Sequence, residues 1–316
     1  MLMLAGLMSL MAVGGIAFVG DVFDNDTDAG DAEVDPDGQI DPGIQTDEPD
    51  LILSGDGTDN DIAGGPGADQ INGYGGDDLV SGGDGNDVLH GGDGDDDAAG
   101  DAGDDILHGE DGTDILSGGA GDDQVFGHND NDTLSGGRGA DELIGGLGDD
   151  ALSGGDGDDA LHGGKGNDHL LGGDGKDTLF GGWGDDWVSG LESDPANPGD
   201  NSDFLNGGGG DDTIIAGATD IVTAGDGEDK IVLGNWITQG ESATVMDYDI
   251  GQDQLLMVCD LTNNADPLVE ITADPEMPGV SYVSLDGSEI ATIRSDGSLT
   301  VDDILLIDYS DAPSLG

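Results

Sequence analysis

The chain has 316 residues, of which 63 are glycine, and it carries 72 acidic residues against five lysines and arginines, giving a formal charge of −67. With aromatic residues at 4%, the sequence lacks the apolar surface of a conventional globular core and predicts a chain that stays largely disordered unless cations neutralise it. Nucleic acid is disfavoured as a partner, because five basic residues cannot form the positive surface that phosphate binding requires.

Residues 1–20 carry no charged side chain and are long enough to cross the hydrocarbon of a membrane as an apolar helix. No lysine or arginine precedes this apolar run, and Gly15 and Ala17 form only a weak small-x-small cleavage site. Three interpretations stay open: a membrane anchor, which we favour, an unusual export signal, and a plain hydrophobic terminus. Residues 21–50 are rich in Asp, Pro and Gly and predict an acidic, disordered linker.

From Gly64 to Ser189 the chain divides into units of nine residues without a change of phase. The units read GGPGADQIN, GYGGDDLVS, GGDGNDVLH, GGDGDDDAA, GDAGDDILH, GEDGTDILS, GGAGDDQVF, GHNDNDTLS, GGRGADELI, GGLGDDALS, GGDGDDALH, GGKGNDHLL, GGDGKDTLF and GGWGDDWVS. Each begins with glycine, has aspartate at its sixth position and has an apolar residue at its eighth. A random acidic linker would not keep this phase.

The array is imperfect at both ends. A degenerate unit with Asn60 in place of the aspartate precedes it. After Ser189 the phase is lost, and it returns at Asp203 and Leu205 only after eight additional residues, which we expect to bulge out as a surface loop. The array then closes at Val232.

Each unit consists of a six-residue turn and a three-residue strand. Glycines in the turn permit positive φ and let backbone carbonyls approach an ion, while the aspartate adds a hard anionic oxygen of the kind that calcium binds. The eighth-position side chain points inward and stacks on its equivalents. Because alternate units must face each other to bury this apolar spine, two units form one coil, eighteen residues separate equivalent positions, and Asp69 should neighbour Asp87.

Units such as GGDGNDVLH and GGKGNDHLL resemble the hemolysin-type calcium-binding repeats of the RTX (repeats-in-toxin) family, whose consensus is G-G-x-G-x-D-x-U-x. The resemblance implies an all-β fold in which residues 51–232 form a parallel β-roll of about nine coils that holds multiple Ca²⁺ ions between successive turns. It also implies that turn carbonyls and sixth-position aspartates are the metal ligands. In this chain those aspartates are Asp69, Asp78, Asp87, Asp96, Asp105, Asp114, Asp123, Asp132, Asp141, Asp150, Asp159, Asp168, Asp177, Asp186, Asp203, Asp212 and Asp229.

Several units depart from the consensus. Gly75 and Gly76 shift the glycines of the second unit, His128 and Asp130 replace two glycines of another, and Ala98 fills the spine poorly. We expect weaker calcium sites beside these units.

His90, His108 and His162 all occupy the ninth position of their units. Without cysteine partners or convergent spacing they do not predict a transition-metal site, and an outward position at the end of each strand is the favoured interpretation.

Residues 233–316 contain less glycine, and their strand-like runs, separated by Asp-Gly turns, predict a C-terminal β domain that caps the roll. The segment LTVDDILLIDYS resembles the C-terminal ends of RTX proteins that type I secretion machinery exports, although a simple final strand would look the same.

These features together predict a calcium-binding protein that folds on meeting extracellular calcium. It would lie outside the cell or at the cell surface, with membrane attachment through residues 1–20 left open. The sequence contains no H-E-x-x-H, G-x-S-x-G or G-x-x-x-x-G-K-[ST] motif, so we do not expect an enzyme. An alternative role is a surface adhesion or surface-layer protein that uses the roll as a scaffold. A remnant or accessory of an RTX toxin or hydrolase is a further alternative.

Overall fold

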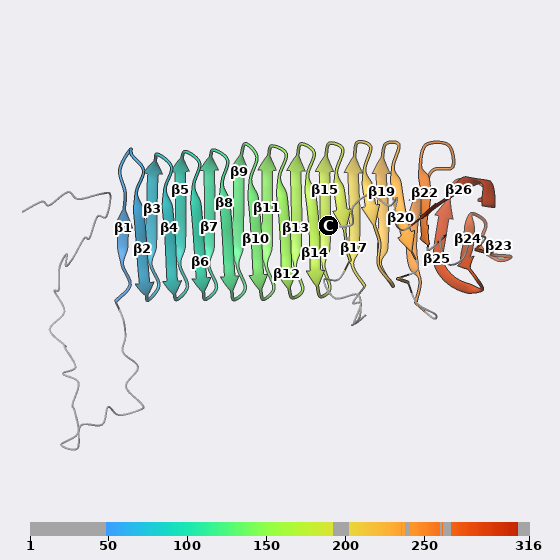
Figure 1. Cartoon of the computed structure of the whole chain (residues 1–316), viewed down its shortest axis with the longest axis horizontal. Helices are drawn as coiled ribbons and strands as arrows, with labels where there is room; N and C mark the ends of the chain where they lie inside the picture. Colours follow the sequence, from blue (N-terminus) through green and yellow to red (C-terminus); the bar gives the residue numbers. More distant parts are fainter. Residues whose placement is uncertain are drawn as a thin grey trace, which may run out of the picture.

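The structure, a computed structural model, describes residues 49–191, 202–234, 236–237, 241–259, 261 and 267–308. Within these residues the chain winds into an elongated solenoid built from two long sheets (Figure 1). In the repeat array, consecutive strands alternate between the sheets, so each coil contributes one strand to each sheet. The all-β class and the parallel β-roll that the sequence predicts are confirmed.

Among the described residues, the first sheet has 14 strands and the second has 12. The first sheet has the order β1 (Ile52–Ser54), β3 (Gln70–Gly75), β5 (Val88–Asp93), β7 (Ile106–Asp111), β9 (Gln124–Asn129), β11 (Glu142–Leu147), β13 (Ala160–Lys165), β15 (Thr178–Trp183), β17 (Phe204–Gly209), β19 (Ile221–Asp226), β21 (Ala243–Tyr248), β25 (Ser288–Ser295), β24 (Val280–Leu285) and β23 (Val269–Ala273). The second has the order β2 (Asp61–Pro66), β4 (Leu79–Asp84), β6 (Asp97–Ala102), β8 (Ile115–Ala120), β10 (Thr133–Arg138), β12 (Ala151–Asp156), β14 (His169–Asp174), β16 (Trp187–Ser189), β18 (Thr213–Ile215), β20 (Lys230–Gly234), β22 (Gln254–Cys259) and β26 (Ile304–Asp308). A 3-10 helix, η1 (Val301–Asp303), precedes the last strand.

The register of the sheets follows the sequence period. Ile71 pairs with Leu89, eighteen residues later, and the same step recurs through the array. Between β15 and β17 the step lengthens, and Leu179 pairs with Leu205 in an unbroken ladder. The additional residues after Ser189 therefore leave the register intact, as the sequence predicts. Residues 192–201, on which the predicted surface loop falls, lie outside the described residues.

The eighth-position side chains form the core of the roll, because alternate residues of a strand point to opposite faces of its sheet. None of them is more than 2% exposed in the regular array. They are Ile71, Val80, Leu89, Ala98, Leu107, Leu116, Val125, Leu134, Leu143, Leu152, Leu161, Leu170, Leu179 and Val188. Ala98 occupies the same buried place as its larger equivalents, so the spine is continuous but thinner at that coil.

Both sheets continue beyond Val232, where the sequence predicts a boundary between the roll and a cap. Strands β21 and β25 extend the first sheet in parallel, and β22 and β26 extend the second. Strands β24 and β23 then add to β25 in antiparallel order at the end of the solenoid. The C-terminal region is therefore rich in strands, as expected, but it is continuous with both sheets of the roll.

The apolar segment 1–20 lies outside the described residues, so its predicted helix stays a prediction. In the part of the chain that the structure describes, no helix is long and apolar enough to cross a membrane.

Glycine at the first position of each unit is required by a close approach between coils. A Cβ atom at Gly154 would overlap Oδ2 of Asp159 and lie 2.6 Å from the carbonyl oxygen of Gly172. At Gly209, by contrast, a Cβ atom would lie 3.6 Å from the nearest atom, on the Trp183 ring. We expect Gly154→Ala to lower the free energy of unfolding by about 2 kcal/mol or more, and Gly209→Ala by less than about 0.5 kcal/mol. Chemical denaturation under identical ionic conditions measures both, and equal losses would contradict the packing argument.

Candidate functional site

The sixth-position aspartates, from Asp69 to Asp229, form a continuous buried ladder, and we call them the ladder aspartates. None of them is more than 3% exposed. The backbone N–H of one donates a hydrogen bond to Oδ1 of the next ladder aspartate on the same side of the roll, as from Asp69 to Asp87 at 2.7 Å and from Asp132 to Asp150 at 2.8 Å. The predicted neighbours are thus confirmed, and one oxygen of each carboxylate is fixed by the preceding coil.

The second oxygen of these carboxylates has a different environment. Oδ2 is buried and has no hydrogen-bond partner in Asp69, Asp78, Asp87, Asp96, Asp105, Asp114, Asp123, Asp132, Asp141, Asp150, Asp159, Asp168, Asp177, Asp186, Asp212 and Asp229. An anionic oxygen that is buried without a partner costs several kcal/mol, and folded proteins rarely tolerate even one. A repeating row of such oxygens calls for neutralisation, either by protonation or by a repeating cation.

Backbone carbonyl oxygens lie beside the orphaned Oδ2 atoms. Oδ2 of Asp69 fills the space over Gly64 that a Cβ atom would occupy, and the carbonyl oxygen of Gly82 lies 2.6 Å from that same point. In the described residues, no group of three or more His, Cys, Asp or Glu side chains is placed to hold a metal ion. An ion in the turns would therefore take one or two carboxylates and draw its remaining ligands from carbonyls and water, an all-oxygen set that suits calcium.

Burial makes the ladder carboxylates hard to ionise. It raises the pKa of Asp132, Asp159, Asp168 and Asp212 to about 7, although a backbone N–H donated to each works in the opposite direction. Repulsion from neighbouring ladder carboxylates adds to the rise. The pKa is raised to about 6 in Asp96, Asp105, Asp114, Asp123, Asp177, Asp186 and Asp229. A bound cation would reverse this balance by favouring the ionised form.

The structure adds two aspartates to the ladder that sequence reasoning missed. Asp220 accepts the N–H of Asp203 at 3.0 Å, and Asp253 accepts the N–H of Asp229 at 3.3 Å. They were missed because the unit of Asp220 is shortened and Asp253 lies beyond the array. In both cases an apolar residue stands two positions after the aspartate, and this spacing is the sequence signal that could have identified them. In both residues the second carboxylate oxygen is also hydrogen-bonded. Asp220 Oδ2 accepts the N–H of Gly217, and Asp253 Oδ2 accepts the N–H of Asp249.

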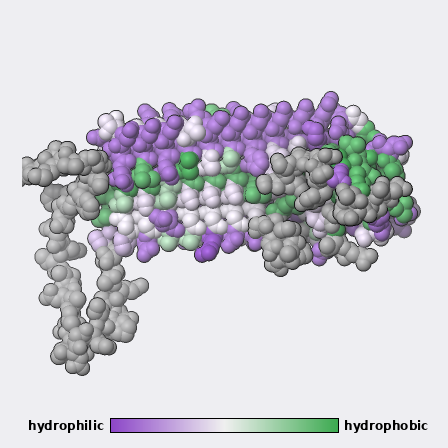
Figure 2. All heavy atoms as spheres, in the orientation of Figure 1, coloured by the Kyte–Doolittle hydropathy of each residue, from purple (hydrophilic) through white to green (hydrophobic). Residues whose placement is uncertain are grey.

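A second row of polar side chains runs along the outside of the turns at the fifth position. Here the direction of bonding is reversed, since Asp77 Oδ1 accepts the N–H of Asp95 at 3.1 Å, and Asp104 Oδ1 accepts the N–H of Asp122 at 3.0 Å. These side chains are exposed, and hydrophilic residues line one long edge of the roll in Figure 2. The row gives the turns a negative surface that concentrates cations.

The departures from the consensus stay in register. Asn60 donates its N–H to Asp78 Oδ1 at 2.7 Å and so begins the ladder without contributing a carboxylate. His128 and Asp130 hold φ values of 82° and 69°, in the left-handed region that glycine occupies in other units. Asp132, in the same unit, keeps the ladder contacts of its equivalents.

A family model for the RTX calcium-binding nonapeptide repeat matches residues 54–89, 90–125, 126–161, 153–188 and 198–231. These segments cover more than half of the chain and coincide with the ladder. No curated protein matches the chain.

Proposed function

The chain belongs to the RTX family of calcium-binding nonapeptide-repeat proteins, and on that premise we propose that its ladder aspartates hold a row of calcium ions between successive turns. The ligands would be the Oδ2 atoms of the ladder aspartates, completed by turn carbonyls and water. Asp220 and Asp253 are left out of this set, because backbone N–H groups already occupy both of their carboxylate oxygens.

The orphaned Oδ2 atoms are the observation that carries this proposal. They recur with the period of the coils, they are buried, and turn carbonyls lie beside them. The chain has only five lysines and arginines, so its own cations cannot neutralise the ladder. Calcium meets both requirements, because it accepts six to eight oxygen ligands in adaptable geometry and carries two positive charges.

Counting bound ions tests the proposal directly. Equilibrium dialysis against calcium at millimolar concentration, followed by elemental analysis, should give about fifteen ions per chain, close to one for each orphaned oxygen. Magnesium at the same concentration should bind in much smaller number, because it demands a stricter octahedral geometry and dehydrates reluctantly. A stoichiometry of one or two calcium ions would rule out a row of sites.

Two neighbouring aspartates allow the effect of losing a proposed calcium ligand to be distinguished from the effect of losing a surface charge. Asp150 is a ladder aspartate, whereas Asp149 is exposed and accepts the N–H of Asn167 at 2.8 Å. We expect Asp150→Asn to lower the free energy of unfolding of the calcium-loaded protein by about 1 to 3 kcal/mol, because an anionic ligand is lost at full burial. Asp149→Asn should change it by less than about 0.5 kcal/mol. Denaturant titrations in saturating calcium measure both, and a similar loss in the two variants would argue against a ligand role for Asp150.

We propose further that the chain acts outside the cell or at its surface, where millimolar calcium would load the turns. In this proposal the chain has no catalytic role, and type I secretion machinery recognises its C-terminal end. Intact mass spectrometry of the protein recovered from medium and from membranes tests this placement. Recovery only from the cytosol would contradict it, and the recovered mass would show whether residues 1–20 are retained.

A further inference from the structure

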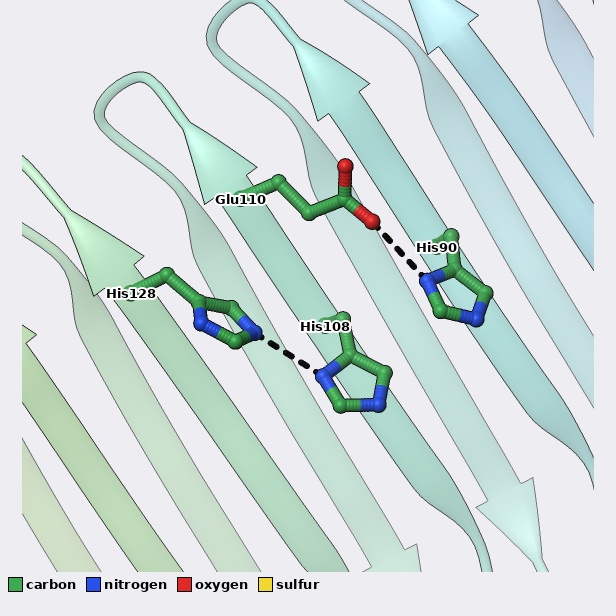
Figure 3. A network of polar contacts seen from close by, with 4 residues as sticks. All are labelled: His90, His108, Glu110 and His128. Carbon is green, nitrogen blue, oxygen red and sulfur yellow. Dashed lines mark hydrogen bonds and ion pairs between the residues drawn. The ribbon is translucent and has the colours of Figure 1, made fainter.

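Three histidines and a glutamate lie together on the outer face of the first sheet (Figure 3). His90 is in β5, His108 and Glu110 are in β7, and His128 is in β9. His90 Nδ1 lies 2.9 Å from Oε1 of Glu110, and His108 Nδ1 lies 2.9 Å from Nε2 of His128. Each pair joins two coils and is separated by twenty residues in the sequence.

The left-handed backbone at the second position of a unit produces this spacing. Glu110 and His128 have φ values of 89° and 82°, which direct their side chains toward the ninth-position residue of the preceding coil. The second sheet repeats the arrangement, since Ser81 Oγ donates to Asp101 Oδ2 at 2.7 Å, again across twenty residues. Contact between these two positions therefore recurs where the second-position glycine is replaced by Asp101, Glu110 or His128.

Packing fixes the ring of His108. It stacks between the rings of His90 and Phe126, with centroids 4.7 Å and 4.9 Å away and ring planes inclined by 15° and 14°. Burial, followed by the neighbouring imidazoles, lowers the pKa of His108, while the Glu110 carboxylate acts in the opposite direction. The strongly acidic surface of the roll adds a negative potential around it.

The two imidazole nitrogens are close enough to bind one metal ion together. His108 Nδ1 and His128 Nε2 lie 2.9 Å apart in their hydrogen bond, and two nitrogens on one ion, with metal–nitrogen bonds of about 2.0 to 2.1 Å, are separated by about 2.9 to 3.3 Å. The hydrogen bond is given up when both lone pairs turn toward the ion. Square-planar and tetragonal sites of nitrogen and oxygen ligands are typical of Cu²⁺ and Ni²⁺, and Cu²⁺ has the higher affinity.

We propose that His108 and His128 form a bidentate site for a tetragonal transition-metal ion, with Cu²⁺ preferred over Ni²⁺. Water completes the coordination, because the described residues place no third His, Cys, Asp or Glu side chain to form a metal-binding group with these two. The Glu110 carboxylate, in the same strand as His108, adds negative charge near the ion. To bind the metal, the imidazole that donates in the present hydrogen bond moves its proton to its other ring nitrogen, so no net proton is released.

This site was not predicted from the sequence, where only the ninth-position histidines were compared. Their spacing does not converge, and the partner of His108 comes from the second position of a later coil. His162 shows the difference, because the equivalent place in the following coil is Gly182 and no imidazole faces it. His162 therefore serves as a control at the same position of the same sheet.

Copper titration of the calcium-saturated full chain tests the proposal, followed by electron paramagnetic resonance of the bound Cu²⁺. The informative variant is His128→Gly, which restores the second-position glycine of the other units and so should fold at least as well. We expect the wild type to bind one Cu²⁺ with a tetragonal spectrum and coupling to two imidazole nitrogens. Affinity should fall at least about tenfold in His128→Gly and in His108→Gln, and should be unchanged in His162→Gln.

Three results would overturn the proposal. The first is a wild-type spectrum without coupling to nitrogen, which would place the copper on carboxylates. The second is an affinity in His128→Gly equal to that of the wild type, and the third is a loss in His162→Gln as large as that in His108→Gln. Because His128 belongs to the turn half of its unit, every titration is made in saturating calcium, and the calcium content of each variant is measured in parallel so that a loss of copper binding is distinguished from a loss of calcium.

Discussion

Removal of calcium at about pH 8 is expected to unfold the repeat array and abolish most of its strand signal. At that pH the ladder carboxylates whose pKa is raised to about 6 or about 7, such as those of Asp96 and Asp132, would be ionised. In the folded roll they would be buried and stacked one coil apart without a cation between them. Unfolding returns each carboxylate to water, and the net charge of −67 on the whole chain favours the same expansion.

The apolar core cannot resist this change by itself. Each unit of nine residues buries one large apolar side chain in the spine, and the coil with Ala98 buries still less. The conformational entropy that is lost when the backbone of those nine residues becomes ordered opposes folding. We therefore expect the roll to depend on its turns, and the turns to depend on bound calcium.

Far-UV circular dichroism with calcium and with a chelator measures the effect, and light scattering gives the accompanying change in hydrodynamic radius. We expect a disordered spectrum in chelator, recovery of the strand signal on adding calcium, and little recovery with magnesium as the control ion. Strand content that stays unchanged in chelator would refute calcium-dependent folding.

The sequence was sufficient to predict the features that depend on the repeat itself. Because the period is strict, the coil length, the buried eighth position and the pairing of Asp69 with Asp87 follow from counting residues. The pairing of Leu179 with Leu205 was predictable for the same reason. After the additional residues that follow Ser189, the nine-residue phase returns at the position that keeps an apolar side chain in the spine.

Features that depend on contacts across coils without a sequence period were not predictable. The sequence does not reveal that, in Asp87 for example, Oδ1 accepts a hydrogen bond from the preceding coil while Oδ2 is buried without a hydrogen-bond partner. The contact of His108 with His128 needs the left-handed backbone of the second position as well as the coil length. Asp253 was missed because the last coils keep the parallel pairing of the roll after the glycine-rich consensus has ended.

Lowering the pH from about 8 to about 5 is expected to have opposite effects on the roll with and without calcium. In the metal-free roll the pKa of Asp159 is raised to about 7, chiefly by burial, from an ordinary value near 3.8. A carboxyl group whose pKa is higher in the folded state contributes stability that is fully present below its unfolded pKa and is lost as the pH rises through its folded pKa. Acidification should therefore stabilise the metal-free roll, and its strand signal in chelator should grow as the pH falls from about 8 to about 5.

With calcium present we expect acidification to destabilise the roll, because protons and calcium compete for the same carboxylate oxygens. We expect calcium affinity to fall over this interval and calcium binding near pH 6 to release protons, which calorimetry in buffers of different ionisation enthalpy measures.

Asp159→Asn should reduce both effects, because it replaces one ladder carboxylate with a group that does not titrate. Its exposed neighbour provides the control variant Asp158→Asn, which should leave both effects nearly unchanged. A metal-free strand signal that weakens on acidification would show that the ladder carboxylates are not the groups that oppose folding.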